Sequence, residues 1–238
     1  MTTDHIVKSF DEDLKKLDNI IAEMGGLAEV QLADAVEALI KRDTDLADRV
    51  IAGDKKIDAL EAELDGQATM TLALRQPMAD DLRVTITALR TASLIERIGD
   101  YAKNIAKRSV VLAQSPPLGP TKSIARMATL VQGMTKDVLD AYVARDVDKA
   151  EAVRARDADA DLLHTSLFRE ILTYMMEDPR TITSCTHLLF VSKNLERIGD
   201  HATNIAELVY YLVKGVPPTD EREKSDASSF TVVDPDRD

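Results

Sequence analysis

ERIGDYAKNIA, residues 96–106, recurs as ERIGDHATNIA at residues 196–206, with nine of the eleven positions identical. The sequence upstream of each copy is also related, since RDTD at residues 42–45 is matched by RDVD at residues 145–148. The two copies align at an offset of 103 residues in their first two helices and of 100 residues in their third. This difference of three residues falls at the turn before the third helix. A shared period with a length change confined to a turn indicates duplication of one structural unit.

An amphipathic period predicts three long helices in each unit. The first helix carries apolar residues at steps of four and three: Phe10, Leu14, Leu17, Ile21, Met24, Ala28, Ala35 and Leu39. Asp43 is placed to cap a second helix, and Pro77 to start a third, because Pro suits the first turn of a helix and not its interior. Asp178 and Pro179 have the same roles before the sixth helix.

The predicted fold is therefore all-α, with two tandem repeats of a three-helix bundle, a pseudo-twofold relation between them and six long helices. The first repeat spans residues 1–114 and the second residues 122–214, and a Pro-rich linker at residues 115–121 separates them. Residues 215–238 form an acidic tail without periodicity, for which we expect disorder and assign no function.

Composition supports this fold class and excludes several functions. Hydrophobic residues reach 45% but aromatic residues only 4%, as expected for helices with an aliphatic core. With 30 basic and 42 acidic side chains the net charge is −12, which disfavours nucleic-acid binding. Cys185 is the only cysteine, so no internal disulfide forms, and its apolar surroundings predict a buried thiol. The absence of an apolar leader or a membrane-length apolar stretch predicts a cytoplasmic protein without direct membrane insertion.

The carboxylates of the repeated motif share a helical stripe. Steps of four and three from Leu82 reach Glu96 and then Asp100, so this pair is expected to face the bundle interior. Glu196 and Asp200 are the equivalent pair in the second repeat.

The preceding helix of each repeat carries acids that can face these pairs: Asp54 and Asp58 in the first repeat, Asp157 and Asp161 in the second. Helices joined by a short turn pack antiparallel, and Asp58 lies as far from that turn as Glu96 does. Converging carboxylates are costly to bury unless they are compensated. A hard cation bound by oxygen ligands supplies that compensation, so the eight acids predict metal sites for Fe, Zn, Mn or Mg.

Other interpretations of these acids stay open. They can form a solvated helix face, or they can pair with Arg97 and Arg197 and leave no metal site. His164 and His201 are either incidental or ligands. Because the first repeat has Glu61 and Tyr101 at those two positions, the two sites can differ in metal or occupancy.

The duplicated motif, together with MGG at residues 24–26, RQP at 75–77 and YMMED at 174–178, resembles the PhoU family of bacterial phosphate-uptake regulators. The likeness covers roughly residues 8–215. It implies two three-helix bundles with metal ions or clusters at the two E-x-x-x-D motifs.

The resemblance also implies a cytoplasmic, homodimeric accessory protein that represses the phosphate regulon when phosphate is ample. Such a protein is expected to connect the ATPase subunit of the phosphate ABC transporter with a phosphate-sensor histidine kinase. Two alternatives remain: a metal-carboxylate enzyme or iron-storage bundle, which Asp161 and His164 approach most closely, and a structural scaffold without metal. No nucleophile and base set or Gly-rich phosphate loop is legible, so we expect no enzyme.

Overall fold

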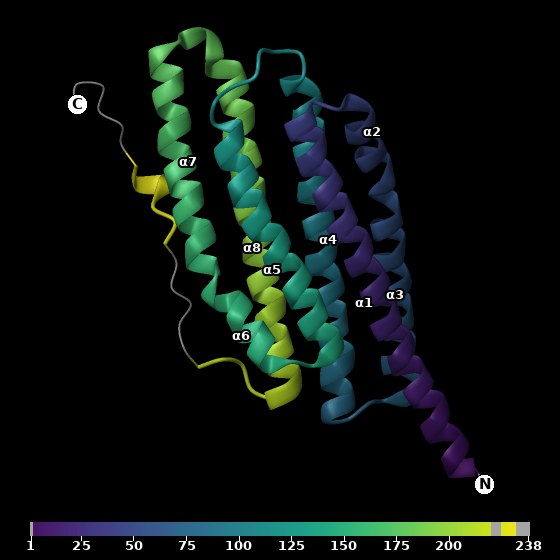
Figure 1. Ribbon diagram of the computed structural model, residues 1–238. Helices are drawn as coiled ribbons and strands as arrows, with labels where there is room; N and C mark the ends of the chain where they lie inside the picture. Colours follow the sequence, from purple (N-terminus) through teal and green to yellow (C-terminus); the bar gives the residue numbers. More distant parts are fainter. Residues whose placement is uncertain (1, 220–224, 232–238) are drawn as a thin grey trace.

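Eight α-helices account for most of the chain in this computed structural model, which describes residues 2–219 and 225–231 (Figure 1). Side chains are described from Glu12 onward, Phe230 excepted. The first repeat comprises α1 (Thr2–Lys41), α2 (Thr44–Gly53), α3 (Lys55–Arg75) and α4 (Asp80–Leu112). The second comprises α5 (Thr121–Ala144), α6 (Val147–Ala155), α7 (Asp157–Glu177) and α8 (Ile182–Lys214). Short 3-10 helices lie at Pro179–Thr181 and Ser228–Phe230.

The all-α prediction is confirmed, and the described ranges contain no strand. One detail differs, because the predicted second and fifth helices are each divided. The break lies at Asp54 between α2 and α3, and at Arg156 between α6 and α7. Since it recurs within one residue of the equivalent position, it belongs to the repeated unit and does not depend on the Gly53 of the first copy alone.

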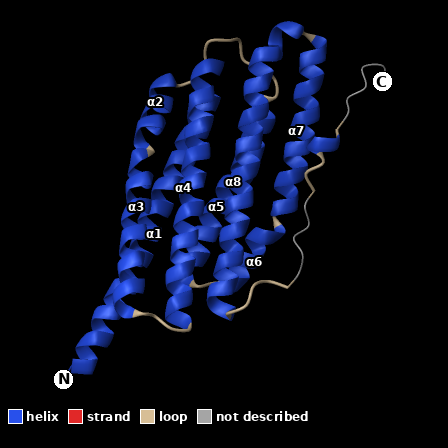
Figure 2. Cartoon of the chain, turned by 180° about the vertical axis from the view of Figure 1, so that it is seen from behind, coloured by secondary structure: helices blue, strands red, loops and turns tan. Residues whose placement is uncertain are grey.

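The helices run side by side as two bundles that share one seam (Figures 1 and 2). Across the seam α4 packs against α8, and α1 packs against α5. The rings of Tyr101 and His201 stack at the seam, with centroids 5.5 Å apart and planes 11° from parallel. These residues occupy equivalent positions in the two repeats, so their contact marks the place where the pseudo-twofold axis passes.

In helices that pack against the bundle through a single face, the apolar residues predicted to form the core are buried. Leu17, Ile21 and Met24 of α1 are fully buried or nearly so, and so is the α5 stripe: Ile124, Met127, Val131, Met134, Val138 and Ala141. Cys185 is also fully buried, as predicted.

The face of α4 that the sequence predicts to be buried, the one that carries Leu82 and Ile86, is wrong. Leu82 and Ile86 are 39% and 38% exposed, whereas the small residues Thr85, Ala88 and Ala92 are buried. The physical reason is that α4 contacts α1, α2, α3 and α8 together. Small side chains permit that close packing, and they carry too little apolar surface to mark the buried face in the sequence.

Matching turns connect the helices of both repeats. Arg42 and Arg145 each adopt a left-handed backbone, with φ of 58° and 55°. Each is followed by an aspartate that caps the next helix: Asp43 accepts from Leu46 N at 2.9 Å, and Asp146 accepts from Lys149 N at 3.0 Å. The cap predicted at Asp43 is confirmed.

Both helices that carry the repeated motif begin three residues after the predicted start. α4 begins at Asp80 because Gln76 and Ala79 take positive φ values of 49° and 51°, which no helix accommodates. α8 begins at Ile182, since the Asp178 cap and Pro179 open a 3-10 turn first.

Residues 225–231, which belong to the predicted tail, lie against α7. The parts of the predicted tail at residues 220–224 and 232–238 lie outside the described residues. In the part of the chain that the structure describes, no helix combines the length and apolarity needed to span a membrane.

The paired caps give a direct test of the repeat. Asp43→Ala and Asp146→Ala should each lower the free energy of unfolding by about 1 kcal/mol, because each leaves a helix N–H without its acceptor. Urea denaturation followed by circular dichroism measures this. Asp48→Ala, which changes an exposed residue inside α2, is the matched control, and equal stability of all three variants would contradict the capping role.

Candidate functional site

In the first repeat, acids from the α2–α3 break and from α4 meet around a lysine. Asp54 is only 3% exposed, and its Oδ1 accepts a hydrogen bond from Gln31 Nε2 at 2.9 Å. Its Oδ2 accepts from the Lys103 ammonium. Lys103 also donates to Asp100 Oδ1 at 2.5 Å. These contacts form one network that joins α1, α4 and the break.

Glu96 and Asp58 lie at the edge of this network. The Glu96 side chain is 20% exposed, and burial, followed by the charges of Asp100 and Glu61, raises its pKa to about 7. Burial and the Asp54 charge raise the pKa of Asp58, which is exposed. The Asp58 charge also acts on Glu96, as expected for acids on facing helices.

The expected interior position of the first pair is wrong, because Glu96 and Asp100 are only half-buried. They border the core that Ile95, Ile98 and Ala102 form, since the true buried face of α4 differs from the predicted stripe. The Nε of neighbouring Arg97 approaches Glu96 Oε2 at 3.8 Å.

The second repeat buries its acids more deeply. Asp157, Asp161 and Glu196 are 2%, 4% and 6% exposed, while Asp200 is half-buried. Thr203 Oγ1 donates to Asp157 Oδ1 at 3.0 Å, and Lys193 Nζ lies 2.9 Å from Glu196 Oε2.

Burial raises the pKa of both Asp161 and Glu196. Backbone hydrogen bonds at Asp161 and the Lys193 ammonium at Glu196 oppose that shift. The charged form of each carboxyl is therefore favoured by its donors, which for Asp161 come from a distant segment and for Glu196 from the preceding turn of α8.

Residues of the tail supply the donors at Asp161. The backbone N–H groups of Ser225 and Asp226 donate to Asp161 Oδ2 at 2.8 and 3.2 Å. Ala227 N donates to Thr165 Oγ1 at 3.2 Å. The Asp226 carboxylate pairs with Lys193 at 3.2 Å, so one lysine links the tail to Glu196.

Asp226 is held in its charged form at this contact. Although burial opposes it, hydrogen bonds from Ser228 and Lys193 lower the pKa of Asp226 to about 2. The pair with Lys193 therefore persists across the neutral pH range.

The two histidines have different surroundings. His164 is 2% exposed, its Nδ1 lies 2.8 Å from Ser192 Oγ, and burial lowers its pKa. His201 stacks on Tyr101, whose hydroxyl accepts from Arg197 at 3.3 Å. The Ser192 contact of His164 and the Tyr101 contact of His201 are both packing contacts within the bundle.

The structure brings the predicted acids of each repeat into one neighbourhood, but it does not arrange them as ligands. Within residues 2–219 and 225–231, no group of three or more His, Cys, Asp or Glu side chains is arranged to hold a metal ion. The first repeat does not fit a cation as it stands, because an ammonium already bridges Asp54 and Asp100. The second repeat has the oxygen donors that a hard cation prefers. Metal binding therefore stays a prediction.

Sequence reasoning missed Gln31, Lys103 and the tail as partners of the acids. Gln31 and the tail lie far from their acids in sequence and carry no motif. Lys103 did leave a signal, because Lys103 against Thr203 is one of the two differences within the repeated eleven residues.

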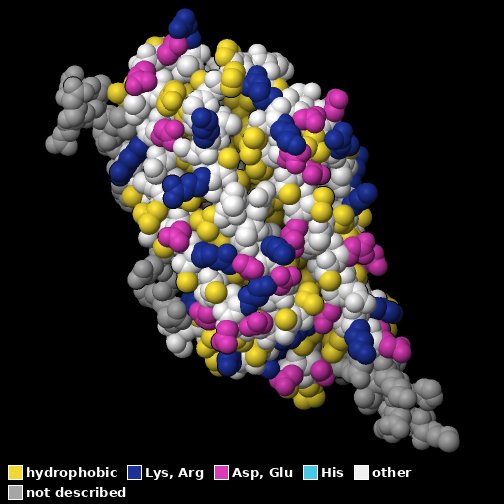
Figure 3. Space-filling view, in the orientation of Figure 1, with side chains coloured by type: hydrophobic (Ala, Val, Ile, Leu, Met, Phe, Trp, Pro, Cys, Tyr) yellow, Lys and Arg dark blue, Asp and Glu magenta, His cyan; other side chains and the backbone are white. Residues whose placement is uncertain are grey.

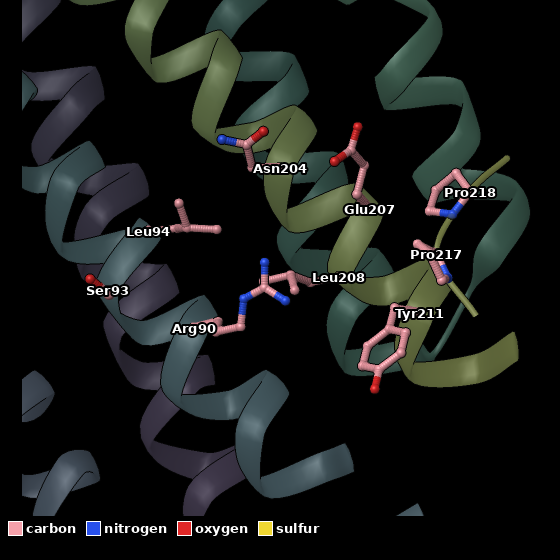
Figure 4. A pocket seen from close by; sticks show the side chains of 9 residues that line it. All are labelled: Arg90, Ser93, Leu94, Asn204, Glu207, Leu208, Tyr211, Pro217 and Pro218. Carbon is pink, nitrogen blue, oxygen red and sulfur yellow. The ribbon is translucent and has the colours of Figure 1, made fainter. Parts of the chain in front are cut away.

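A separate groove of about 640 Å³ opens between α4 and α8 (Figure 4). Figure 4 shows Arg90 of α4 extending toward Leu208 and Tyr211 of α8, with Glu207 on the same helix. None of the eight predicted acids lines it. On the opposite face, acidic and basic side chains are interspersed without an extended basic area (Figure 3).

Comparison with known proteins identifies what the chain is similar to. The family model described as "PhoU domain" matches residues 21–109 and again residues 124–209. A phosphate-specific transport system accessory protein PhoU homologue from Caulobacter vibrioides is 51% identical over 228 residues, which cover 95% of this chain and 99% of the relative. The homologue from Rhizobium meliloti is 50% identical over 230 residues, covering 96% and 97%.

Solved structures agree with the sequence relatives. The crystal structure of PhoU from Pseudomonas aeruginosa matches with a TM-score of 0.84 and 40% identity, covering 87% of this chain and all of that one. The phosphate transport system regulatory protein PhoU from Streptococcus pneumoniae matches with a TM-score of 0.80 and 28% identity, covering 88% and 99%.

The raised pKa of Glu96 predicts a pH-dependent stability. A carboxyl whose folded-state pKa of about 7 exceeds its ordinary 4.5 stabilises the fold at low pH and loses that contribution as pH rises from 4.5 through 7. Glu96→Gln should therefore be about 1 kcal/mol more stable than the wild type at pH 8, and nearly equal to it at pH 4.5. Urea denaturation in chelator-containing buffer at both pH values measures the difference, and an effect of the same size at both would contradict the shift.

The tail contact predicts protected amides. Asp161→Ala removes the acceptor of two tail N–H groups, so hydrogen exchange at Ser225 and Asp226 should become at least tenfold faster. The control is Asp159→Ala, an exposed acid on the same helix, which should leave exchange unchanged. Equal exchange at these amides in the wild type and Asp161→Ala would show that this contact does not hold the tail.

Proposed function

The chain belongs to the PhoU family, and on this basis we propose that it is a regulatory adaptor of phosphate uptake that acts negatively when phosphate is ample. The single observation that carries the proposal is its likeness, over nearly the whole chain, to accessory proteins of phosphate-specific transport. That likeness supports a role in phosphate uptake. Our proposal goes further in two respects: the protein regulates uptake, and it does so by repression.

The partners we propose are the ATPase subunit of the phosphate ABC transporter and the phosphate-sensor histidine kinase. The protein acts on them from the cytoplasm, as a homodimer and without catalysing a reaction. An adaptor needs a surface for a partner, and large exposed apolar side chains mark such surfaces. At the α3–α4 turn, Leu74 and Met78 are 70% and 80% exposed, and Met70 is 55% exposed.

Metal binding is the second part of the proposal, with Fe, Zn, Mn or Mg as candidates. Support comes from the chemistry of the donors, since all four acids of the second repeat offer carboxylate oxygens. Asp157, Asp161 and Glu196 are buried, and Asp200 is half-buried. The iron-storage alternative has less support. Its E-x-x-H type of site would need His164, which is bonded to Ser192, and Asp161, which is bonded to the tail.

Loss of the protein tests the regulatory role. In cells that lack the gene and grow in ample phosphate, a reporter driven by a phosphate-starvation promoter should rise at least tenfold, and wild-type protein should restore repression. Glu196→Ala with Asp200→Ala should derepress the reporter as well, if the acids of the second repeat take part. Unchanged reporter expression in the deletion strain would contradict the adaptor function.

Partner binding tests the exposed turn. Leu74→Asp with Met78→Asp should lower co-purification of the transporter's ATPase subunit at least tenfold, because two charges interrupt the apolar surface. Both residues are exposed, so the melting temperature should not change. Val143→Asp, at a 63% exposed apolar residue on α5, is the matched control, and an equal loss in both variants would place the docking surface elsewhere.

A further inference from the structure

Lys103 is a fixed member of the acid cluster in the first repeat. Its ammonium bonds both Asp54, from the α2–α3 break, and Asp100, one turn earlier on α4. Its side chain is 21% exposed, and the Asp54 side chain 4%. Although burial opposes it, hydrogen bonds to Asp100 and Asp54 raise the pKa of Lys103 above its ordinary value.

The charge of the buried carboxylate is thus compensated within the chain. Gln31 adds a second donor to Asp54, and its Nε2 also bonds the carbonyl of Gly99 at 3.1 Å. Both oxygens of Asp54 therefore have a donor from the protein. A divalent cation bound to Asp54 and Asp100 would have to displace the ammonium, or lie beside it and be repelled.

The second repeat differs at the two corresponding positions. Thr203 stands where the first repeat has Lys103, and it gives Asp157 a neutral hydroxyl in place of an ammonium. Met134 stands where the first repeat has Gln31, at the offset of 103 that relates the early helices. The second repeat therefore has neither the lysine nor the glutamine that the first repeat carries at these two positions.

We propose that Lys103 is the resident counter-ion of the first repeat, so that the Asp54 and Asp100 pair is a permanent ion-pair brace and not a metal site. Any divalent cation that the chain binds through these acids lies in the second repeat. This departs from the expectation of a metal site in each repeat. It rests on the metal-binding part of the proposed function, and it is independent of the regulatory part.

Manganese binding to the full chain tests the inference. Purified protein is stripped with a chelator and titrated with Mn²⁺, with the free ion measured by electron paramagnetic resonance. We expect Lys103→Thr, which copies the second repeat, to bind one more Mn²⁺ per chain than the wild type. Adding Asp54→Asn to Lys103→Thr should abolish that extra ion.

Two further variants keep the inference testable if Lys103→Thr is too unstable to titrate. Asp100→Asn in the otherwise wild-type chain should leave the Mn²⁺ stoichiometry unchanged, whereas Asp157→Asn should lower it. A wild-type chain that loses Mn²⁺ on Asp100→Asn would overturn the inference, as would a folded Lys103→Thr that gains none. A wild-type chain that binds no Mn²⁺, beside a Lys103→Thr variant that binds one, would support the brace and refute the metal-binding part of the proposed function.

Discussion

A buried carboxylate at the break in the second helix of each repeat is the constraint around which both bundles are arranged. Asp54 and Asp157 occupy equivalent positions and are 3% and 2% exposed. Burying an uncompensated ion costs several kcal/mol, so each aspartate requires a donor from a neighbouring helix. For Asp54 the donors come from α1 and α4, and for Asp157 from α8. These bonds tie the broken helix to the helix that carries the repeated motif.

The sequence predicts the features that depend on neighbouring residues. The helices with one buried face follow from their apolar period, and the cap at Asp43 follows from a side chain that bonds an N–H three residues later. The buried face of α4 could not be predicted in the same way. Because several helices surround α4, its close contacts select small residues such as Thr85 and Ala88, which a search for large apolar residues overlooks.

The candidate site was predictable only in part, for a reason of sequence distance. The duplicated motif correctly indicates which helices carry the acids, and their spacing indicates that the acids face one another. Their partners come from elsewhere: Gln31 lies 23 residues from Asp54, and Ser225 lies 64 residues from Asp161. Such contacts depend on the packed fold, and no local sequence pattern predicts them.

The two repeats share a backbone plan but hold their acids by contacts of different kinds. In the first repeat the donors, Gln31 and Lys103, project from long helices whose other faces are packed in the core. Those contacts persist as long as the bundle is folded. In the second repeat, Asp161 is held by backbone N–H groups of residues that follow α8, and loss of those bonds would leave α7 and α8 packed together. The bonds at Asp161 can therefore be lost without unpacking a helix, whereas the bonds at Asp54 come from helices of the bundle itself.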